Sequence, residues 1–209
     1  MKLIFLGPPG AGKGTLAEKV VGILNAPQIS TGVIFRNAIE TGCSLGLKVK
    51  AIIDAGKLVD DETTIELVKR RLAEEDAREN YILDGFPRTV IQADALAEFS
   101  LVDKVVNFDI PDSLVLERMS GRRVCRGCGH NYHNLFYKPK VEGICDHCGG
   151  EVYSRGDDKI ETIQRRVEIY RTQTVPLIDY YRNKGILVDV DARPAMDQVV
   201  ENFKKALKL

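Results

Sequence analysis

The chain has 209 residues, of which 44% are hydrophobic and 29% charged, a composition typical of one globular core domain with room for small insertions. Lys plus Arg and Asp plus Glu number 30 each, so no global field attracts nucleic acid or membrane, and any anion site must be built locally. No apolar run reaches the roughly 18 residues that span a bilayer, and the apolar start is too short for a signal peptide. We therefore expect a cytoplasmic protein without membrane association.

The first half of the chain begins with a strand, a glycine-rich turn and a helix, the start of a βα unit. Glycines then divide residues 30–59 into short helical stretches without a strand pattern, which predicts a helical insertion. The elements expected here are a strand over Lys2–Leu6, a turn over Gly7–Gly14, helices over Thr15–Asn25 and Glu62–Ala73, a strand over Tyr81–Asp84 and a helix over Thr89–Ala97.

The second half contains an interruption, because residues 122–158 carry glycines, cysteines and scattered aromatics without helical period. The elements expected around it are a strand over Lys104–Ile110, a helix over Asp112–Gly121, a long helix over Ile160–Lys184 with a kink at Pro176, a strand over Gly185–Val190 and a helix over Met196–Leu209. Unbroken apolar strands of this kind are typical of a parallel sheet with both faces covered by helices. We predict an α/β fold whose core domain combines residues 1–29, 60–121 and 159–209.

The strongest motif is Gly7-Pro-Pro-Gly-Ala-Gly-Lys-Gly-Thr15, which matches G-x-x-x-x-G-K and predicts a P-loop NTPase-type sheet. Glycines let backbone N–H groups turn toward a phosphate, and the N-terminus of the following helix adds positive charge. The predicted ATP-phosphate ligands are Gly10, Ala11, Gly12, Lys13, Gly14 and Thr15. Gly14 occupies the place where most P-loops carry a hydroxyl for Mg²⁺. Asp84, at a strand end, is therefore the expected carboxylate for the waters of Mg²⁺, the alternative being a turn-capping Asp.

Further motifs follow in order: Ser30-Thr-Gly with Arg36, Asp54-Ala-Gly-Lys-Leu-Val59, Leu83-Asp-Gly-Phe-Pro-Arg-Thr89, Gly121-Arg-Arg123, and Arg155 with Asp157, Asp158 and Arg166. With this set the chain resembles the adenylate kinase family over essentially its whole length. The resemblance implies reversible phosphoryl transfer, ATP + AMP = 2 ADP, by a monomer that uses Mg²⁺ with ATP. It also implies that residues 30–59 are an AMP-binding insertion and residues 122–158 a lid.

The resemblance assigns one group of residues to AMP: Thr31, Arg36, Lys57, Leu58, Val59, Gly85, Phe86, Pro87, Arg88, Gln92, Arg155 and Arg166. Guanidinium groups suit this role because each can pair with two phosphate oxygens. The amide of Gln92 can offer a donor and an acceptor to the edge of adenine. Val33 departs from the family pattern, which has Asp at that place, and removes a hydrogen-bond acceptor from the insertion.

A second group is assigned to ATP and to catalysis. The implied ATP residues outside the glycine loop are Arg118, Arg122, Asn131, Tyr132 and Pro194, and the implied catalytic residues are Lys13, Asp84, Arg88, Arg122, Arg155 and Arg166. On one helix, Arg118 and Arg122 would share a face because they are four residues apart. Asp157 and Asp158 are expected to orient the lid arginines. No general base is expected, because the AMP phosphate is already an anionic nucleophile.

Four of the five cysteines form two C-x-x-C pairs, Cys125 with Cys128 and Cys145 with Cys148, separated by residues 129–144. This spacing is typical of a closed, structural Zn²⁺ site, with iron or another metal as the alternative. A module this small cannot build its own apolar core, so a metal would stabilise the lid. His130, His133 and His147 are interpreted as bystanders and Cys43 as an ordinary thiol.

Two other functions share some of these motifs. A nucleoside monophosphate kinase for UMP, CMP or GMP would have the same glycine loop, but Gln92 and the Leu58-Val59 segment favour AMP. A nucleic-acid-binding zinc ribbon would use the basic residues of the lid. Acidic residues interrupt these, so no long basic stripe forms and no nucleic-acid partner is expected.

Overall fold

The computed structural model describes all 209 residues and is built around a five-stranded parallel sheet of order β2-β3-β1-β4-β8. The strands are β1 (Lys2–Leu6), β2 (Gln28–Ser30), β3 (Tyr81–Asp84), β4 (Lys104–Asp109) and β8 (Leu187–Asp191). All four pairings are parallel, as the unbroken apolar runs predict. Sequence reasoning missed β2, because its three residues, Gln-Ile-Ser, form no apolar run.

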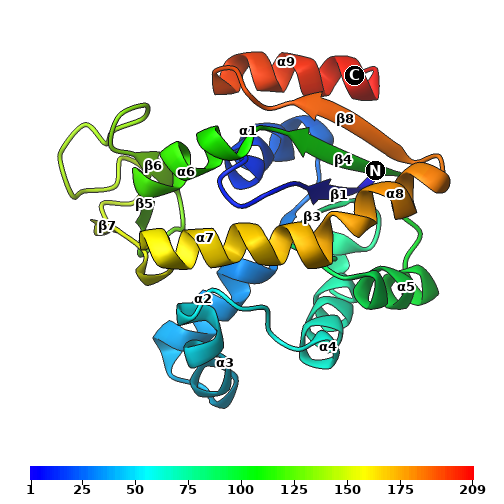
Figure 1. The fold of residues 1–209 in the computed structure, drawn as a ribbon, viewed down its shortest axis with the longest axis horizontal. Coiled ribbons are helices and arrows are strands. Elements are labelled where there is room, and N and C mark those ends of the chain that lie inside the picture. The colour runs from blue at the N-terminus through cyan, green and yellow to red at the C-terminus, as the bar shows by residue number, and fades with distance from the viewer.

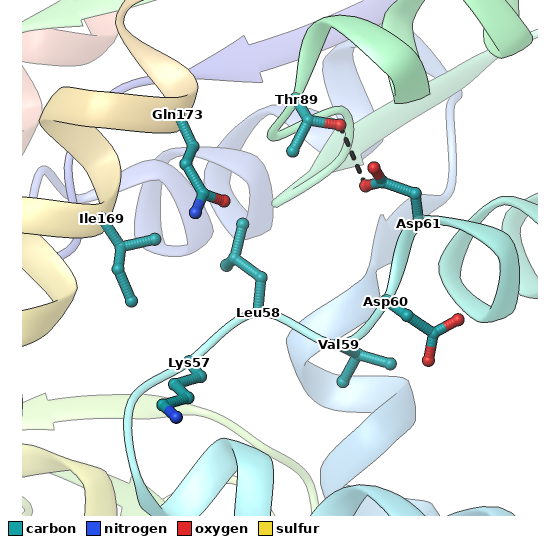
Figure 2. Close-up of a pocket in the computed structure, with 8 residues that line it drawn as sticks. All are labelled: Lys57, Leu58, Val59, Asp60, Asp61, Thr89, Ile169 and Gln173. Atoms are coloured by element: carbon teal, nitrogen blue, oxygen red, sulfur yellow. Dashed lines mark hydrogen bonds between the residues drawn. The ribbon is translucent and has the colours of Figure 1, made fainter.

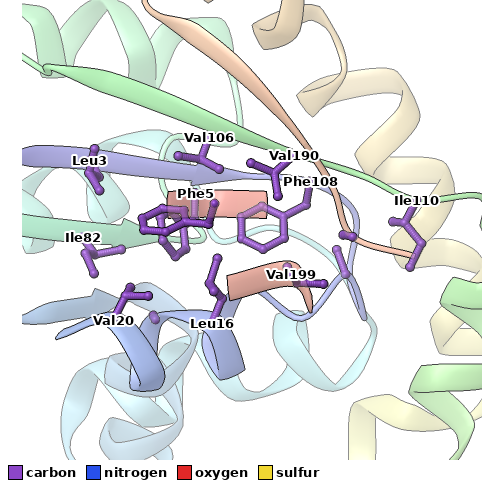
Figure 3. Packing of buried hydrophobic residues seen from close by; sticks show 14 of the residues in the cluster. Leu3, Phe5, Leu16, Val20, Ile82, Val106, Phe108, Ile110, Val190 and Val199 are labelled. Carbon is purple, nitrogen blue, oxygen red and sulfur yellow. The ribbon is translucent and has the colours of Figure 1, made fainter. Parts of the chain in front are cut away.

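Helices cover both faces of this sheet (Figure 1). In β1, Leu3 and Phe5 enter one apolar cluster while Ile4 and Leu6 enter another, since successive strand residues point to opposite faces. The first cluster includes side chains from α1 (Lys13–Leu24), α6 (Asp112–Ser120), α7 (Ile160–Ile169) and α9 (Met196–Leu207), and Figure 3 shows its centre. The second includes side chains from α4 (Asp61–Leu72), α5 (Val90–Phe99) and α8 (Pro176–Asn183).

A helical hairpin of α2 (Thr31–Thr41) and α3 (Ser44–Asp54) projects from the sheet. It has a small apolar cluster of its own, formed by Phe35, Val49 and Val59. The two helices touch at Gly46, where an added Cβ would lie 1.9 Å from the carbonyl oxygen of Ala38. Only glycine permits this approach, so Gly46 determines how closely the helices pack. After α4, a 3₁₀ turn η1 (Glu75–Ala77) leads into β3.

Residues 122–158 form a second, antiparallel sheet of order β6-β5-β7 at one end of the molecule (Figure 1). Its strands are β5 (Arg122–Cys125), β6 (Asn131–His133) and β7 (Val152–Tyr153), followed by the 3₁₀ turn η2 (Gly156–Asp158). The predicted helix over Asp112–Gly121 ends at Ser120, so Arg118 belongs to α6 and Arg122 begins β5. The expectation that these arginines share one helical face is therefore wrong, because Gly121 turns the chain into the small sheet.

The predicted long helix near Pro176 is divided into α7, a π-helical turn η3 (Tyr170–Thr174) and α8. The N–H of Val175 reaches five residues back to the carbonyl of Tyr170, at 2.9 Å. Pro176 lacks an N–H, so the irregularity falls directly before it. The turn places Thr174 where its Oγ1 donates to the carbonyl of Arg88, at 2.9 Å. No helix in the structure combines the length and apolar character needed to cross a membrane.

Candidate functional site

The glycine loop connects the carboxyl end of β1 to the N-terminus of α1, at the centre of the sheet. Gly10 and Gly12 have φ of 77° and 89°, a left-handed conformation that favours glycine. No side chain caps α1, so the N–H groups of its first turn are available to an anion. The predicted phosphate ligands Gly10, Ala11, Gly12, Lys13, Gly14 and Thr15 all lie in this loop and first turn.

The Lys13 ammonium is folded back over the glycine loop, and its Nζ donates to the carbonyls of Gly7 and Pro8, both at 2.7 Å. Burial lowers the pKa of Lys13 to about 8. The carboxylate of Asp84 opposes this change, while the nearby guanidinium groups of Arg88, Arg166 and Arg122 add to it. One ammonium and three guanidinium groups therefore act on a common region, which is arranged for an anion.

Asp84 ends β3, directly beside Phe5 of β1, and its carboxylate faces the start of α1. An added Cβ on Gly14 would lie 3.6 Å from Asp84 Oδ2, and Gln28 Nε2 donates to the same oxygen at 3.2 Å. The absence of a side chain at Gly14 therefore leaves this carboxylate open toward the glycine loop. A hard oxygen ligand facing a phosphate site fits Mg²⁺ held through its waters. Sequence reasoning missed Gln28 because β2 itself has so weak a pattern.

Three arginines share two aspartates where the lid joins α7. Arg122 pairs with Asp158, Arg155 pairs with Asp157, and Arg166 donates to Asp157 Oδ2 at 2.7 Å and to Asp158 Oδ1 at 3.4 Å. Burial lowers the pKa of Arg166 to about 9, while Asp158 outweighs burial and raises that of Arg122. Burial would raise the pKa of Asp157, but Arg155 and Arg166 hold it well below its usual range. The cluster retains one uncompensated positive charge, which a phosphate can neutralise.

Three of the predicted AMP residues, Thr31, Gly85 and Arg88, lie at or just after the carboxyl ends of β2 and β3. Thr31 Oγ1 and Arg88 Nε both donate to the carbonyl of Gly85, each at 2.8 Å. Gly85 has φ of 79°, and an added Cβ there would lie 2.7 Å from Arg88 Nη2, so the turn requires glycine. Arg36 extends beside Gly32, and burial lowers its pKa to about 9. Neither guanidinium group forms an ion pair with a carboxylate, and the charges of Arg155 and Asp157 act on the pKa of both.

Within the Gly85–Arg88 turn, the side chain of Phe86 faces the core. The peptide bond between Phe86 and Pro87 is cis, and the Phe86 side chain is fully buried in the second apolar cluster. Gln92 is 2% exposed, its Oε1 accepts from the N–H of Arg88 at 2.7 Å, and its Nε2 donates to Asp61 Oδ1 at 2.8 Å. Gln92 thus joins the Arg88 turn to the start of α4.

A cavity of about 380 Å³ adjoins this network (Figure 2). Its lining comes from the Lys57–Asp61 segment, Thr89, Ile169 and Gln173. Figure 2 shows the Leu58 side chain pointing into the space between α7–η3 and the Thr89–Asp61 hydrogen bond. Lys57, Leu58 and Val59 were predicted, whereas Asp61, Ile169 and Gln173 were missed. An acidic residue such as Asp61 is common in the first turn of a helix, and Ile169 and Gln173 are common within helices. The sequence pattern therefore did not indicate that these three residues line a cavity.

The lid approaches α1 through Asn131, whose Nδ2 donates to Glu18 Oε1 at 2.9 Å, and through His130, whose Nδ1 lies 2.9 Å from Glu18 Oε2. Glu18 was missed, since a single Glu on an amphipathic helix carries no signal. Arg118 donates to the carbonyls of Ala192 and Arg193, both at 2.8 Å, and of Pro194 at 3.3 Å. Arg118 therefore lies with Pro194 beside α9, away from the arginine cluster of the lid.

The four lid cysteines converge, with all four Sγ atoms within 4.8 Å of one another. Cys125 Sγ lies 3.4 Å from Cys148 Sγ, and Cys128 Sγ lies 3.6 Å from Cys145 Sγ. A tetrahedral ion with bonds of about 2.3 Å would hold its sulfurs roughly 3.8 Å apart, so the donor set fits Zn²⁺. Each residue supplies one soft ligand, and no fifth donor is needed.

Hydrogen bonds to Cys145 favour its thiolate, whereas burial raises the pKa values of Cys125 and Cys128. Burial opposes ionisation of Cys145, but the Tyr132 hydroxyl and the N–H groups of His147 and Cys148 lower its pKa to about 6. Tyr132 is buried, with its hydroxyl 3.4 Å from Cys145 Sγ, so its side chain belongs to the cysteine cluster. Donors of this kind orient and tune metal ligands.

The parallel sheet, the glycine loop at its centre and the convergent lysine and arginines define a P-loop phosphotransferase. The family profile described as "Adenylate kinase" matches residues 5–186. The chain is 57% identical over 204 residues to an adenylate kinase of Treponema denticola, covering 98% of both chains. It is 50% identical to one from Clostridium tetani, covering 99% of this chain and 98% of that one, and 48% identical to one from Desulfitobacterium hafniense, covering 100% and 98%.

The chain belongs to the adenylate kinase family. It is a nucleoside monophosphate kinase, and its reaction is the reversible transfer of a phosphoryl group, ATP + AMP = 2 ADP. The expected family, fold class and activity are confirmed.

Proposed function

We propose that the two substrates meet between the glycine loop and the arginine cluster of the lid. The observation that carries this proposal is the convergence of charge, since Lys13 lies within the influence of Arg88, Arg122 and Arg166, which come from three separate parts of the chain. Arg122, Arg155 and Arg166 have only Asp157 and Asp158 as ion-pair partners, and Arg88 has none, so the region keeps a net positive charge that a phosphate can compensate.

In this proposal the ATP phosphates lie on residues 10–15, with Lys13 reaching the β- and γ-phosphates. Arg118, Asn131, the Tyr132 backbone and Pro194 border the rest of ATP. Arg36 and Arg88 bind the AMP phosphate, and Thr31 and Gly85 lie next to it. The adenine base of AMP hydrogen-bonds to the Gln92 amide and is bordered by residues 57–59. Arg122, Arg155 and Arg166 surround the transferring phosphoryl group, so catalysis is positioning and charge stabilisation without a covalent intermediate.

Asp84 would hold the waters of Mg²⁺, and Mg²⁺ would neutralise part of the phosphate charge. Cys125, Cys128, Cys145 and Cys148 would hold Zn²⁺ as a structural ion. We assign residues 122–158 as the lid, residues 30–59 as the AMP-binding insertion and the remaining segments as the core. The protein acts as a cytoplasmic monomer without a nucleic-acid partner, in keeping with its zero net charge.

The test is ADP production from ATP with AMP, UMP, CMP or GMP, with zinc content determined on the same sample. Arg88→Ala should lower kcat/KM for AMP by about 10²–10³ because it removes a guanidinium from the transferred charge. Arg78→Ala, an exposed arginine outside the site, is the matched control. Turnover of Arg88→Ala within a few-fold of wild type would refute the assignment.

A further inference from the structure

The Asp61 carboxylate connects two helices beside the proposed AMP site. Asp61 is the first residue of α4, and its Oδ1 accepts from Gln92 Nε2 at 2.8 Å and from Thr89 Oγ1 at 2.9 Å. Thr89 caps α5, because its Oγ1 also accepts from the backbone N–H of Gln92 at 3.2 Å. A single carboxylate oxygen therefore holds both the side chain of Gln92 and the start of the helix that carries it. Figure 2 shows the contact with Thr89.

The partners of Gln92 determine which way its amide faces. Its Oε1 accepts from the Arg88 N–H, which can only donate, and its Nε2 donates to Asp61, whose carboxylate can only accept. A turned amide would place donor against donor and acceptor against acceptor in a buried site. Each end of the amide makes one hydrogen bond to the protein, which leaves one N–H and one lone pair for a ligand.

We propose that Asp61 is a positioning residue that sets the purine selectivity of the monophosphate site by fixing the orientation of the Gln92 amide. This inference rests on the proposed function, in which Gln92 meets the base of AMP. A 6-aminopurine presents an acceptor at N1 and a donor at N6, whereas a 6-oxopurine presents a donor at N1 and an acceptor at O6. The fixed amide matches the first pattern, and only a turned amide matches the second.

Asp61 differs from its neighbour Glu62 in its contacts with Gln92 and Thr89. Asp61 and Glu62 both lie in the first turn of α4, where an acidic side chain interacts favourably with the helix dipole. Asp61 reaches Gln92 and lines the cavity, whereas Glu62 is exposed. Glu62→Ala is therefore a matched control, because it removes the same charge from the same turn without touching the amide.

The experiment measures the KM for AMP, kcat, and the inhibition constant of inosine monophosphate, a 6-oxopurine nucleotide, against AMP. Asp61→Ala should raise the KM for AMP about tenfold and keep kcat within about twofold, as expected for a lost hydrogen bond to a charged group. The ratio of the inosine monophosphate inhibition constant to the AMP KM should fall about tenfold. Asp61→Asn, which keeps an oxygen acceptor, should stay within about threefold of wild type in all three quantities.

Gln92→Ala separates failure of this inference from failure of the proposed site. If Gln92→Ala leaves the KM for AMP unchanged, the AMP-site assignment is wrong. If Gln92→Ala raises that KM but Asp61→Ala changes no ratio, the site stands and the role of Asp61 is wrong. A fall of kcat with an unchanged ratio in Asp61→Ala would indicate a merely structural role and would also overturn the proposal. Asp61→Ser, whose hydroxyl is too short to reach Gln92, replaces the alanine variant should that one not fold.

Discussion

The core and the lid of this protein are stabilised by different physical means. The central sheet is enclosed by two apolar clusters of 19 and 13 buried residues. The lid contains a cluster of only three buried residues, Cys125, Tyr132 and Cys145, two of which are cysteines. The core can therefore form by burial of apolar surface, whereas the lid has little apolar surface to bury, is held in part by ion pairs and would gain stability from a metal on its four cysteines.

The two regions also hold their charges differently. In the core, the Lys13 ammonium hydrogen-bonds only to carbonyls, and burial destabilises its charge. In the lid, Arg155 and Arg166 are paired with the carboxylate of Asp157. The buried charge of Lys13 therefore lowers the stability of the core, whereas the lid cluster is largely neutralised by its own aspartates.

The largest expected effect comes from removing the core cation. Lys13→Met should lower kcat/KM by about 10³, because a charge that contacts the phosphates is lost. It should leave the melting temperature equal or slightly raised, since a destabilised charge is removed. Steady-state kinetics and thermal unfolding check both results. Lys19→Met, an exposed lysine on the same helix, is the control and should change neither quantity. A melting temperature that falls in Lys13→Met but not in Lys19→Met would show that the Lys13 charge stabilises the core, contrary to this expectation.

Removal of the metal tests how the lid is stabilised. Chelation or Cys145→Ser should lower the melting temperature by about 5–10 °C, because the lid has almost no apolar core to replace the ion. Hydrogen exchange should show loss of protection in residues 122–158 before β1 or β4. Cys43→Ser, an exposed cysteine outside the cluster, is the matched control. A melting temperature no lower than that of this control would contradict a structural role for the metal.

Asp157→Asn should cost about 2 kcal/mol of unfolding free energy at pH 7, since hydrogen bonds to two buried arginines lose their charge. The pKa of Asp157 is depressed below its ordinary 3.8, so its stabilisation is present above that pH and is lost as the pH falls further. The difference between wild type and variant in urea unfolding should therefore shrink below about pH 4. Asp179→Asn, in an exposed ion pair, should change stability little. An equal loss of unfolding free energy in Asp157→Asn and Asp179→Asn would contradict the larger contribution expected of the buried ion pair.

The smallest expected effect is proton uptake by Lys13 when ATP binds. The pKa of Lys13 is about 8 in the free protein against an ordinary 10.5, and a bound phosphate favours the charged ammonium. ATP binding at pH 8.5 should therefore take up a fraction of a proton, and affinity should fall as pH rises above 8. Because the unfolded chain binds more protons between pH 8 and 10.5, this group makes unfolding harder as pH rises through that window. Calorimetry in two buffers checks the uptake, and equal uptake by Lys13→Met would exclude Lys13 as its source.

Some parts of the site could be predicted from the sequence because the chemistry is local. The glycine loop and the two C-x-x-C pairs bring their groups together within a few residues, so spacing alone indicates a phosphate cradle and a four-sulfur site. Arg118 was placed wrongly relative to Arg122, because a single glycine ended the helix between them. Asp61 and Glu18 carried no signal, since each makes its contacts with residues far away in the chain.

The sequence by itself determined the parallel sheet, the phosphate loop, the cysteine cluster and the family, because these depend on apolar runs and on short, fixed spacings. Only the tertiary structure decided which carboxylates pair with which cations, how the Gln92 amide is oriented, and that the Tyr132 hydroxyl donates to Cys145 Sγ. Those features depend on side chains that meet across separate elements. Burial determines how strongly each of these contacts contributes to stability and to pKa shifts, and burial is a property of the packed molecule.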